Sequence, residues 1–127
     1  LGAIDSDARA NSMPGLTGGF EWIMRNSGRV AIGTDASGAG YGSGFHHELA
    51  LLAARGMPED QVLRYATAGG AIALGLSLEV GTLEPGRLAD LLVVDGDPLN
   101  EIGDLEAILA TVVGGIWHSS ESQATDD

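Results

Sequence analysis

Asp35 is the residue of this sequence whose type and position best suit catalysis. It follows residues 29–33, a short apolar run that is typical of a strand buried on both faces. A carboxylate at the carboxyl end of such a strand lies where α/β enzymes often collect their catalytic groups. It can bind zinc or another divalent metal, and it can accept a proton from metal-bound water, whose pKa falls to about 7. Asp35 is therefore the candidate metal ligand and catalytic residue, with an Asx turn or a helix cap as the simpler alternative.

His46 and His47 are the nearest other side chains that could take part in such chemistry. Adjacent residues on a helix point about 100° apart, so the two rings cannot readily hold one metal ion. We predict for His46 a contact to substrate or to a metal ligand. The alternative is a helix start at which one ring packs against the chain and the other lies in solvent. The glycine-rich run 38–44 fits a flexible active-site rim, because its alternating glycines do not match nucleotide-binding loops.

The composition narrows the chemistry further. The chain has no cysteine, so any metal site must use histidine and carboxylate ligands. Its six basic residues are all arginine, and the absence of lysine excludes Schiff-base catalysis and a P-loop. A net charge of −12 argues against binding to nucleic acid or to an acidic membrane surface. Because the sequence shows no signal peptide and no apolar stretch of about 20 residues, we expect a cytoplasmic location and no membrane insertion.

The helices that would position these residues follow from hydrophobic spacing and from helix-ending residues. The spacing predicts three of them, at residues 19–26, 46–55 and 58–74. Gly56 is well placed to end the second helix, with Pro58 just beyond it. In the third helix, Gly69 and Gly70 each cost roughly 1 kcal/mol relative to alanine. We therefore expect a kink or very close packing at this glycine pair.

Strands are expected in the second half of the chain. The extended patterns cover residues 89–95, 108–113 and 116–118, and Gly114-Gly115 predicts a two-residue hairpin turn between the last two. Together these patterns describe one unit with four stretches. They are an arm and short helix at 1–28, a strand, loop and helices at 29–76, sheet strands at 77–118, and a disordered tail at 119–127.

Three motifs in fixed order resemble the C-terminal region of the metal-dependent amidohydrolase superfamily, in particular its imidazolonepropionase-like and proline-dipeptidase-like branches. They are Gly33-Thr34-Asp35, the stretch 45–58 with Phe45-His46-His47-Glu48-Leu49, and the run Gly-Thr-Leu-Glu-Pro-Gly-Arg-Leu-Ala-Asp-Leu at 81–91. The third motif is the most specific, and the resemblance covers about residues 28–118. One departure is the run 67–71, which stands where the family usually has an Asn-Ala pair.

The resemblance implies an α/β fold: the last β/α unit of a TIM-type (β/α)8 barrel, followed by C-terminal strands of a small composite β-sandwich. In that fold Asp35 would end the eighth barrel strand and bind the metal, whereas Asp90 is expected to bond backbone amides at a turn. A full barrel takes about 250 residues, so this chain would form an incomplete barrel. The family's other ligands are paired histidines on the first strand, later histidines and, in some members, a carboxylated lysine. None of these elements is present in the chain.

The function implied by the resemblance is that of a metal-dependent hydrolase. This chain would be its C-terminal part, and the whole protein would act on the C–N bonds of amides, cyclic amides or dipeptides through metal-activated water, with a small-molecule substrate. Because an isolated barrel segment leaves backbone groups and apolar surface uncovered, we expect a homo-oligomer or a complementary chain carrying the rest of the barrel. The chain alone should then be inactive. The alternative is a noncatalytic remnant that acts as an oligomerisation or interaction module.

Overall fold

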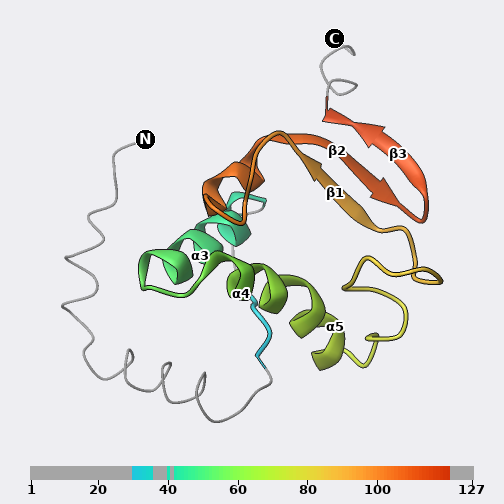
Figure 1. The fold of residues 1–127 in the computed structure, drawn as a ribbon, viewed down its shortest axis with the longest axis horizontal. Helices are drawn as coiled ribbons and strands as arrows, with labels where there is room; N and C mark the ends of the chain where they lie inside the picture. The colour runs from blue at the N-terminus through green and yellow to red at the C-terminus, as the bar shows by residue number, and fades with distance from the viewer. Residues whose placement is uncertain (1–29, 36–39, 41, 121–127) are drawn as a thin grey trace. The chain divides into compact units, whose positions relative to one another are not determined.

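The computed structural model describes residues 30–35, 40 and 42–120 (Figure 1). The chain divides into two units, Leu1–Val30 and Ala31–Asp127. Every helix and strand described below belongs to the second unit. The arm at 1–28 with its short helix, most of the glycine-rich run, and residues 121–127 of the expected disordered tail lie outside the described residues, whereas Ser119, also expected in the tail, ends the strand Ile116–Ser119. The predictions for those stretches therefore stay predictions.

Helix α3 spans Ser43–Ala54 and ends as the sequence predicts. Gly56 adopts a positive φ of 88°, which glycine reaches without a steric penalty. The amide of Gly56 donates to the carbonyl of Ala53, and the amide of Met57 donates to the carbonyl of Leu52. This pair of hydrogen bonds is the Schellman arrangement, which satisfies carbonyls that a helix end would otherwise leave unpaired. It sets the direction in which the chain leaves α3.

The next helix is continuous in direction but changes its winding. It begins as α4, Glu59–Arg64, continues as the π-helical segment η1, Tyr65–Gly69, and ends as α5, Gly70–Ala73. The sequence predicts one helix at 58–74 with a disturbance at Gly69 and Gly70, and the structure places the change from π to α winding between these two glycines. Short π segments inside α-helices are uncommon and widen the helix locally. This segment also lies against the loop that contains the most specific motif, as described below.

The three strands form one antiparallel sheet in the order β1-β2-β3. They are β1, Leu91–Val94, β2, Ile108–Val113, and β3, Ile116–Ser119. Gly114 and Gly115 form the expected two-residue turn between β2 and β3, with φ values of 56° and 84°. Two successive positive φ values are the signature of a type I′ turn, whose twist matches that of a hairpin. The hairpin prediction is confirmed.

The sheet has one buried face and one exposed face. Register pairs Leu91 with Val112 and Val93 with Ala110, so these four residues share a face, and Ala110 and Val112 are buried. The opposite face is exposed: beside Thr111 and His118 it carries the apolar side chains Leu92, Leu109, Val113 and Ile116, with between 45% and 65% of their surface accessible. The resemblance implies that these strands belong to a small composite β-sandwich, and the described residues contain one three-stranded sheet. The second layer therefore stays a prediction.

The buried core joins the helices to the sheet through a short 3-10 helix, η2, Ile102–Glu106. This helix contacts both α3 and β1. Leu49 of α3 and Val62 of α4 are almost completely buried. The other buried apolar residues are Met57, Ala71, Ile102, Leu105, Ala110 and Val112.

The described residues 30–35 form no strand, so the strand expected at 29–33 is not part of the described sheet and stays a prediction. The reason is physical. A strand exists only when a neighbouring strand accepts and donates its backbone hydrogen bonds. The three strands that the structure describes pair with one another in an antiparallel sheet, and Val30 to Gly33 lie outside it. The apolar run remains suited to a parallel sheet, but the described part of the chain supplies no parallel neighbour.

Candidate functional site

Asp35 lies at the end of the described residues 30–35 and is exposed. Its φ is 44°, the only positive φ of a non-glycine residue among those described. Aspartate tolerates this left-handed conformation better than most residues, because its short side chain can bond locally to the backbone. This conformation does not decide between a ligand role and the simpler alternative of an Asx turn or a helix cap. It also leaves the carboxylate accessible, which a metal ligand from a larger site requires.

His46 and His47 occupy the first turn of α3 and differ in burial. His46 is partly buried and His47 is exposed, as expected for a helix start with one ring packed and one in solvent. The Nδ1 atom of His46 is buried and has no hydrogen-bond partner among the described residues. Because the chain's own atoms enclose Nδ1, a substrate could reach this ring only from another side or after the ring turns. Because the described residues form no group of three or more possible metal ligands, the predicted role of His46 stays a prediction.

The described residues do not form a complete metal centre. They contain no group of three or more histidine, cysteine, aspartate or glutamate side chains placed to hold one ion. Catalytic zinc typically has three protein ligands and an open position for water. Asp35 could supply one such ligand, but residues 30–35, 40 and 42–120 do not supply the others. The described residues therefore do not fit a resident metal without ligands from elsewhere.

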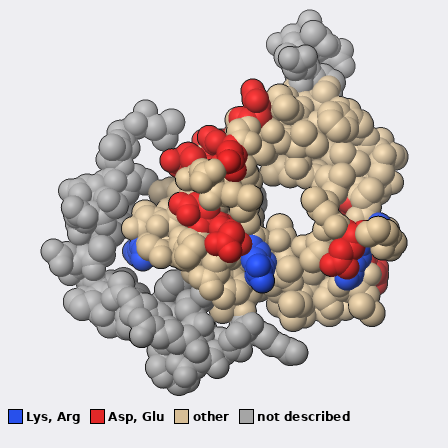
Figure 2. Space-filling view, in the orientation of Figure 1, with Lys and Arg blue, Asp and Glu red and all other residues tan. Residues whose placement is uncertain are grey.

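Acidic side chains outnumber basic ones on the face that Figure 2 shows, as the net charge of −12 requires. Several carboxylates of the loop after β1 serve that loop's own structure. The Asp104 carboxylate accepts a hydrogen bond from the backbone amide of Asp97 at 2.7 Å, and the Asp97 carboxylate accepts one from the Asn100 side chain at 2.6 Å. Asp97 and Asp104 therefore act as turn-forming groups of this part of the chain.

Residues along the most specific motif, 81–91, make contacts that support the fold of the described chain. At its start, Gly81 has a φ of 94° and lies against the π-helical turn. A Cβ atom added to Gly81 would lie 2.7 Å from the Cβ of Ala71, 3.1 Å from the Cα of Ala68 and 3.2 Å from the carbonyl oxygen of Thr67. Only glycine fits so close to a helix backbone. Sequence reasoning did not identify this contact, because nothing local to residue 81 indicates which helix it meets.

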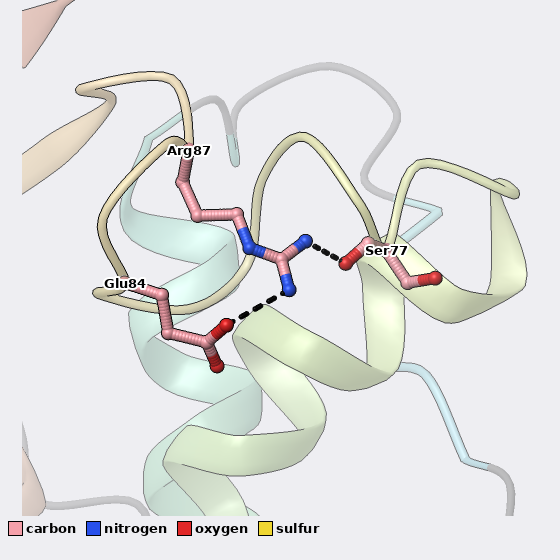
Figure 3. Close-up of polar contacts among 3 residues, drawn as sticks. All are labelled: Ser77, Glu84 and Arg87. Carbon is pink, nitrogen blue, oxygen red and sulfur yellow. Dashed lines mark hydrogen bonds and ion pairs between the residues drawn. The ribbon is translucent and has the colours of Figure 1, made fainter.

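The middle of the motif is a tight turn that Arg87 holds in place (Figure 3). Pro85 and Gly86, the latter with a φ of 91°, occupy the central positions of a turn closed by the Arg87 amide and the Glu84 carbonyl at 3.2 Å. This geometry is typical of a type II turn. The Arg87 guanidinium donates to the backbone carbonyl of Ser77 and pairs with the Glu84 carboxylate at 3.0 Å. Arg87 thus ties the turn to the segment that follows α5.

The ion pair predicts an acid-sensitive contribution to stability. The hydrogen bond and the charge of Arg87 lower the pKa of Glu84 from its ordinary value of 4.5. A lowered folded-state pKa means that the contribution is present above pH 4.5 and is lost as pH falls through the folded-state value. We expect the stability difference between the wild-type chain and Glu84→Gln, measured by urea unfolding, to shrink in acid. The effect should be small, because the carboxylate is solvent-exposed. A difference that grows in acid would contradict this reading; Glu106→Gln provides the baseline for an exposed glutamate.

Asp90, near the end of the motif, bonds the hairpin turn as sequence reasoning expects. Its Oδ1 accepts a hydrogen bond from the backbone amide of Gly114 at 2.6 Å, and the amide of Gly115 donates to the Ala89 carbonyl at 3.0 Å. These two bonds attach the β2–β3 turn to the residues just before β1. The prediction of a structural role for Asp90 is confirmed.

Removal of the Asp90 acceptor should therefore weaken the sheet. We expect Asp90→Ala to lower the free energy of unfolding by about 1 kcal/mol, the usual net value of one hydrogen bond at an exposed site. Asp90→Asn keeps an acceptor oxygen and should retain most of this stability. Urea unfolding of the three proteins checks the expectation. Equal losses in both variants would show that the negative charge of Asp90, and not the bond to Gly114, stabilises the turn.

No helix in the described part of the chain is long and apolar enough to cross a membrane. This agrees with the absence of an apolar stretch in the sequence, while the cytoplasmic location stays a prediction.

Comparison with known proteins shows the family. The sequence model of the amidohydrolase family matches residues 17–117. The chain is similar to the 5-methylthioadenosine/S-adenosylhomocysteine deaminase of Caldanaerobacter subterraneus subsp. tengcongensis, with 31% identity over 114 residues that cover 79% of this chain and 26% of that protein. The protein of the same name from Syntrophobacter fumaroxidans is 57% identical over 49 residues, which cover 39% of this chain and 11% of that protein.

Comparison with a solved structure shows that the fold is also similar to that of a related enzyme. The chain superposes on a Xaa-Pro dipeptidase, solved with bound methionine in its active site, with a TM-score of 0.75 and 28% identity over 84% of this chain and 26% of that one. The chain thus spans about a quarter or less of the length of these relatives. The three motifs, the described helices and hairpin, and the match over residues 17–117 agree, and this chain belongs to the amidohydrolase family.

Proposed function

We propose that this chain is the C-terminal part of a hydrolase that breaks C–N bonds. The observation that carries the proposal is the family match over residues 17–117, which includes all three motifs. The names of the similar proteins support it, because a deaminase and a dipeptidase both cleave a C–N bond. The substrate is proposed to be a small molecule with an amide, cyclic amide, dipeptide or related C–N group. Which of these it is depends on parts of the relatives that this chain does not match.

Asp35 is proposed to be a metal ligand and the acceptor of the proton from the attacking water. Its exposed carboxylate supports this role, because groups from outside the described residues can approach it. When bound, a divalent metal, zinc or another, would supply an activated water near neutral pH. The remaining ligands would come from the rest of a TIM-type barrel. His46 is proposed to contact the substrate or a ligand through the part of its ring that the chain does not enclose.

The same proposal accounts for the apolar surface that the described chain leaves uncovered. Leu74, Leu78 and Leu83 each have at least 75% of their surface accessible, in addition to the exposed face of the sheet. Large apolar side chains exposed in such number commonly mark contacts with other chains or domains when they form a patch. We propose that the remainder of the barrel and the second layer of a β-sandwich cover them, either in a longer polypeptide, in a complementary chain, or in a homo-oligomer.

Metal analysis tests the proposal. In a polypeptide that joins this chain to the rest of the barrel, we expect a stoichiometric divalent metal, measured by mass spectrometry after dialysis, and loss of metal in Asp35→Ala. Asp60→Ala is the matched control, because Asp60 is also an exposed aspartate but lies in the first turn of α4. Unchanged metal content in Asp35→Ala would remove Asp35 from the ligand set. Circular dichroism establishes that both variants fold.

The second candidate is a noncatalytic interaction module. Two observations favour this module. The described residues contain no group of three or more side chains placed to hold a metal ion, and one face of the sheet is uncovered. The purified chain by itself separates the two functions. A stable oligomer without bound metal would favour the module, whereas stoichiometric metal that is lost in Asp35→Ala would favour the hydrolase.

A further inference from the structure

We draw no further inference here: the strongest candidate, the exposed apolar face of the β1-β2-β3 sheet formed by Leu92, Leu109, Val113 and Ile116, carries no proposal because nothing in the structure shows what covers it.

Discussion

Replacing Asp35 with asparagine is expected to lower the kcat of the proposed hydrolase by roughly 100- to 10,000-fold, the usual contribution of a group that transfers a proton in the rate-limiting step. Asparagine keeps the size of the side chain and one oxygen that can approach a metal. It loses the negative charge and cannot accept the proton of the attacking water. The measurement is steady-state kinetics on a polypeptide that contains this chain and the remaining barrel, together with its metal content.

The control for this prediction is Asp60→Asn, which removes an exposed carboxylate from the first turn of α4 and leaves the sequence of residues 30–35 unchanged. We expect it to retain kcat and KM. If Asp35→Asn binds metal normally and turns over at the wild-type rate, Asp35 is not the proton acceptor. If it loses the metal as well as the activity, the ligand role is supported, and the proton-transfer role must be measured again at saturating metal.

Local structure could be predicted from the sequence wherever the signal and its cause lie within a few residues. Gly56 ends α3 because a glycine at that position accepts a positive φ, and Gly114-Gly115 forms the hairpin turn because both residues do. Asp90 is a longer-range success, since its partner Gly114 is 24 residues away. Its turn-bonding role, though not its partner, follows from the residue type.

Structure that depends on distant partners could not be predicted in the same way. The run 29–33 has the composition of a parallel strand, but strand formation needs neighbours, and residues 30–33 are not part of the described sheet. The complete candidate site could not be predicted for the same reason. A metal centre collects ligands from several strands of a barrel, so the position of Asp35 in the sequence indicates one ligand and cannot place the rest. The resemblance to a family, rather than any pattern in the chain, supplies the remaining ligands as an expectation.

The contact between Gly81 and the π-helical turn predicts the largest change in stability. Gly81→Ala must place a Cβ atom 2.7 Å from the Cβ of Ala71, and backbone atoms of Ala68 and Thr67 lie at 3.1 and 3.2 Å. The positive φ of residue 81 costs about 1–2 kcal/mol for alanine, and the overpacking adds about 1–3 kcal/mol. We therefore expect the free energy of unfolding, measured by urea titration, to fall by about 2–5 kcal/mol.

Gly86→Ala is the matched control that separates backbone strain from the close contact. Gly86 has nearly the same φ, 91° against 94°, and an added Cβ would meet nothing within 4 Å. It should therefore lose only the conformational part, about 1–2 kcal/mol. Equal losses in the two variants would mean that residue 81 does not pack tightly against the helix. In a double-mutant cycle, Ala71→Gly should restore part of the stability of Gly81→Ala, because it removes the nearest side-chain atom but leaves the two backbone contacts in place. Partial restoration would show that the most specific motif of the chain needs its first glycine in order to dock on this helix.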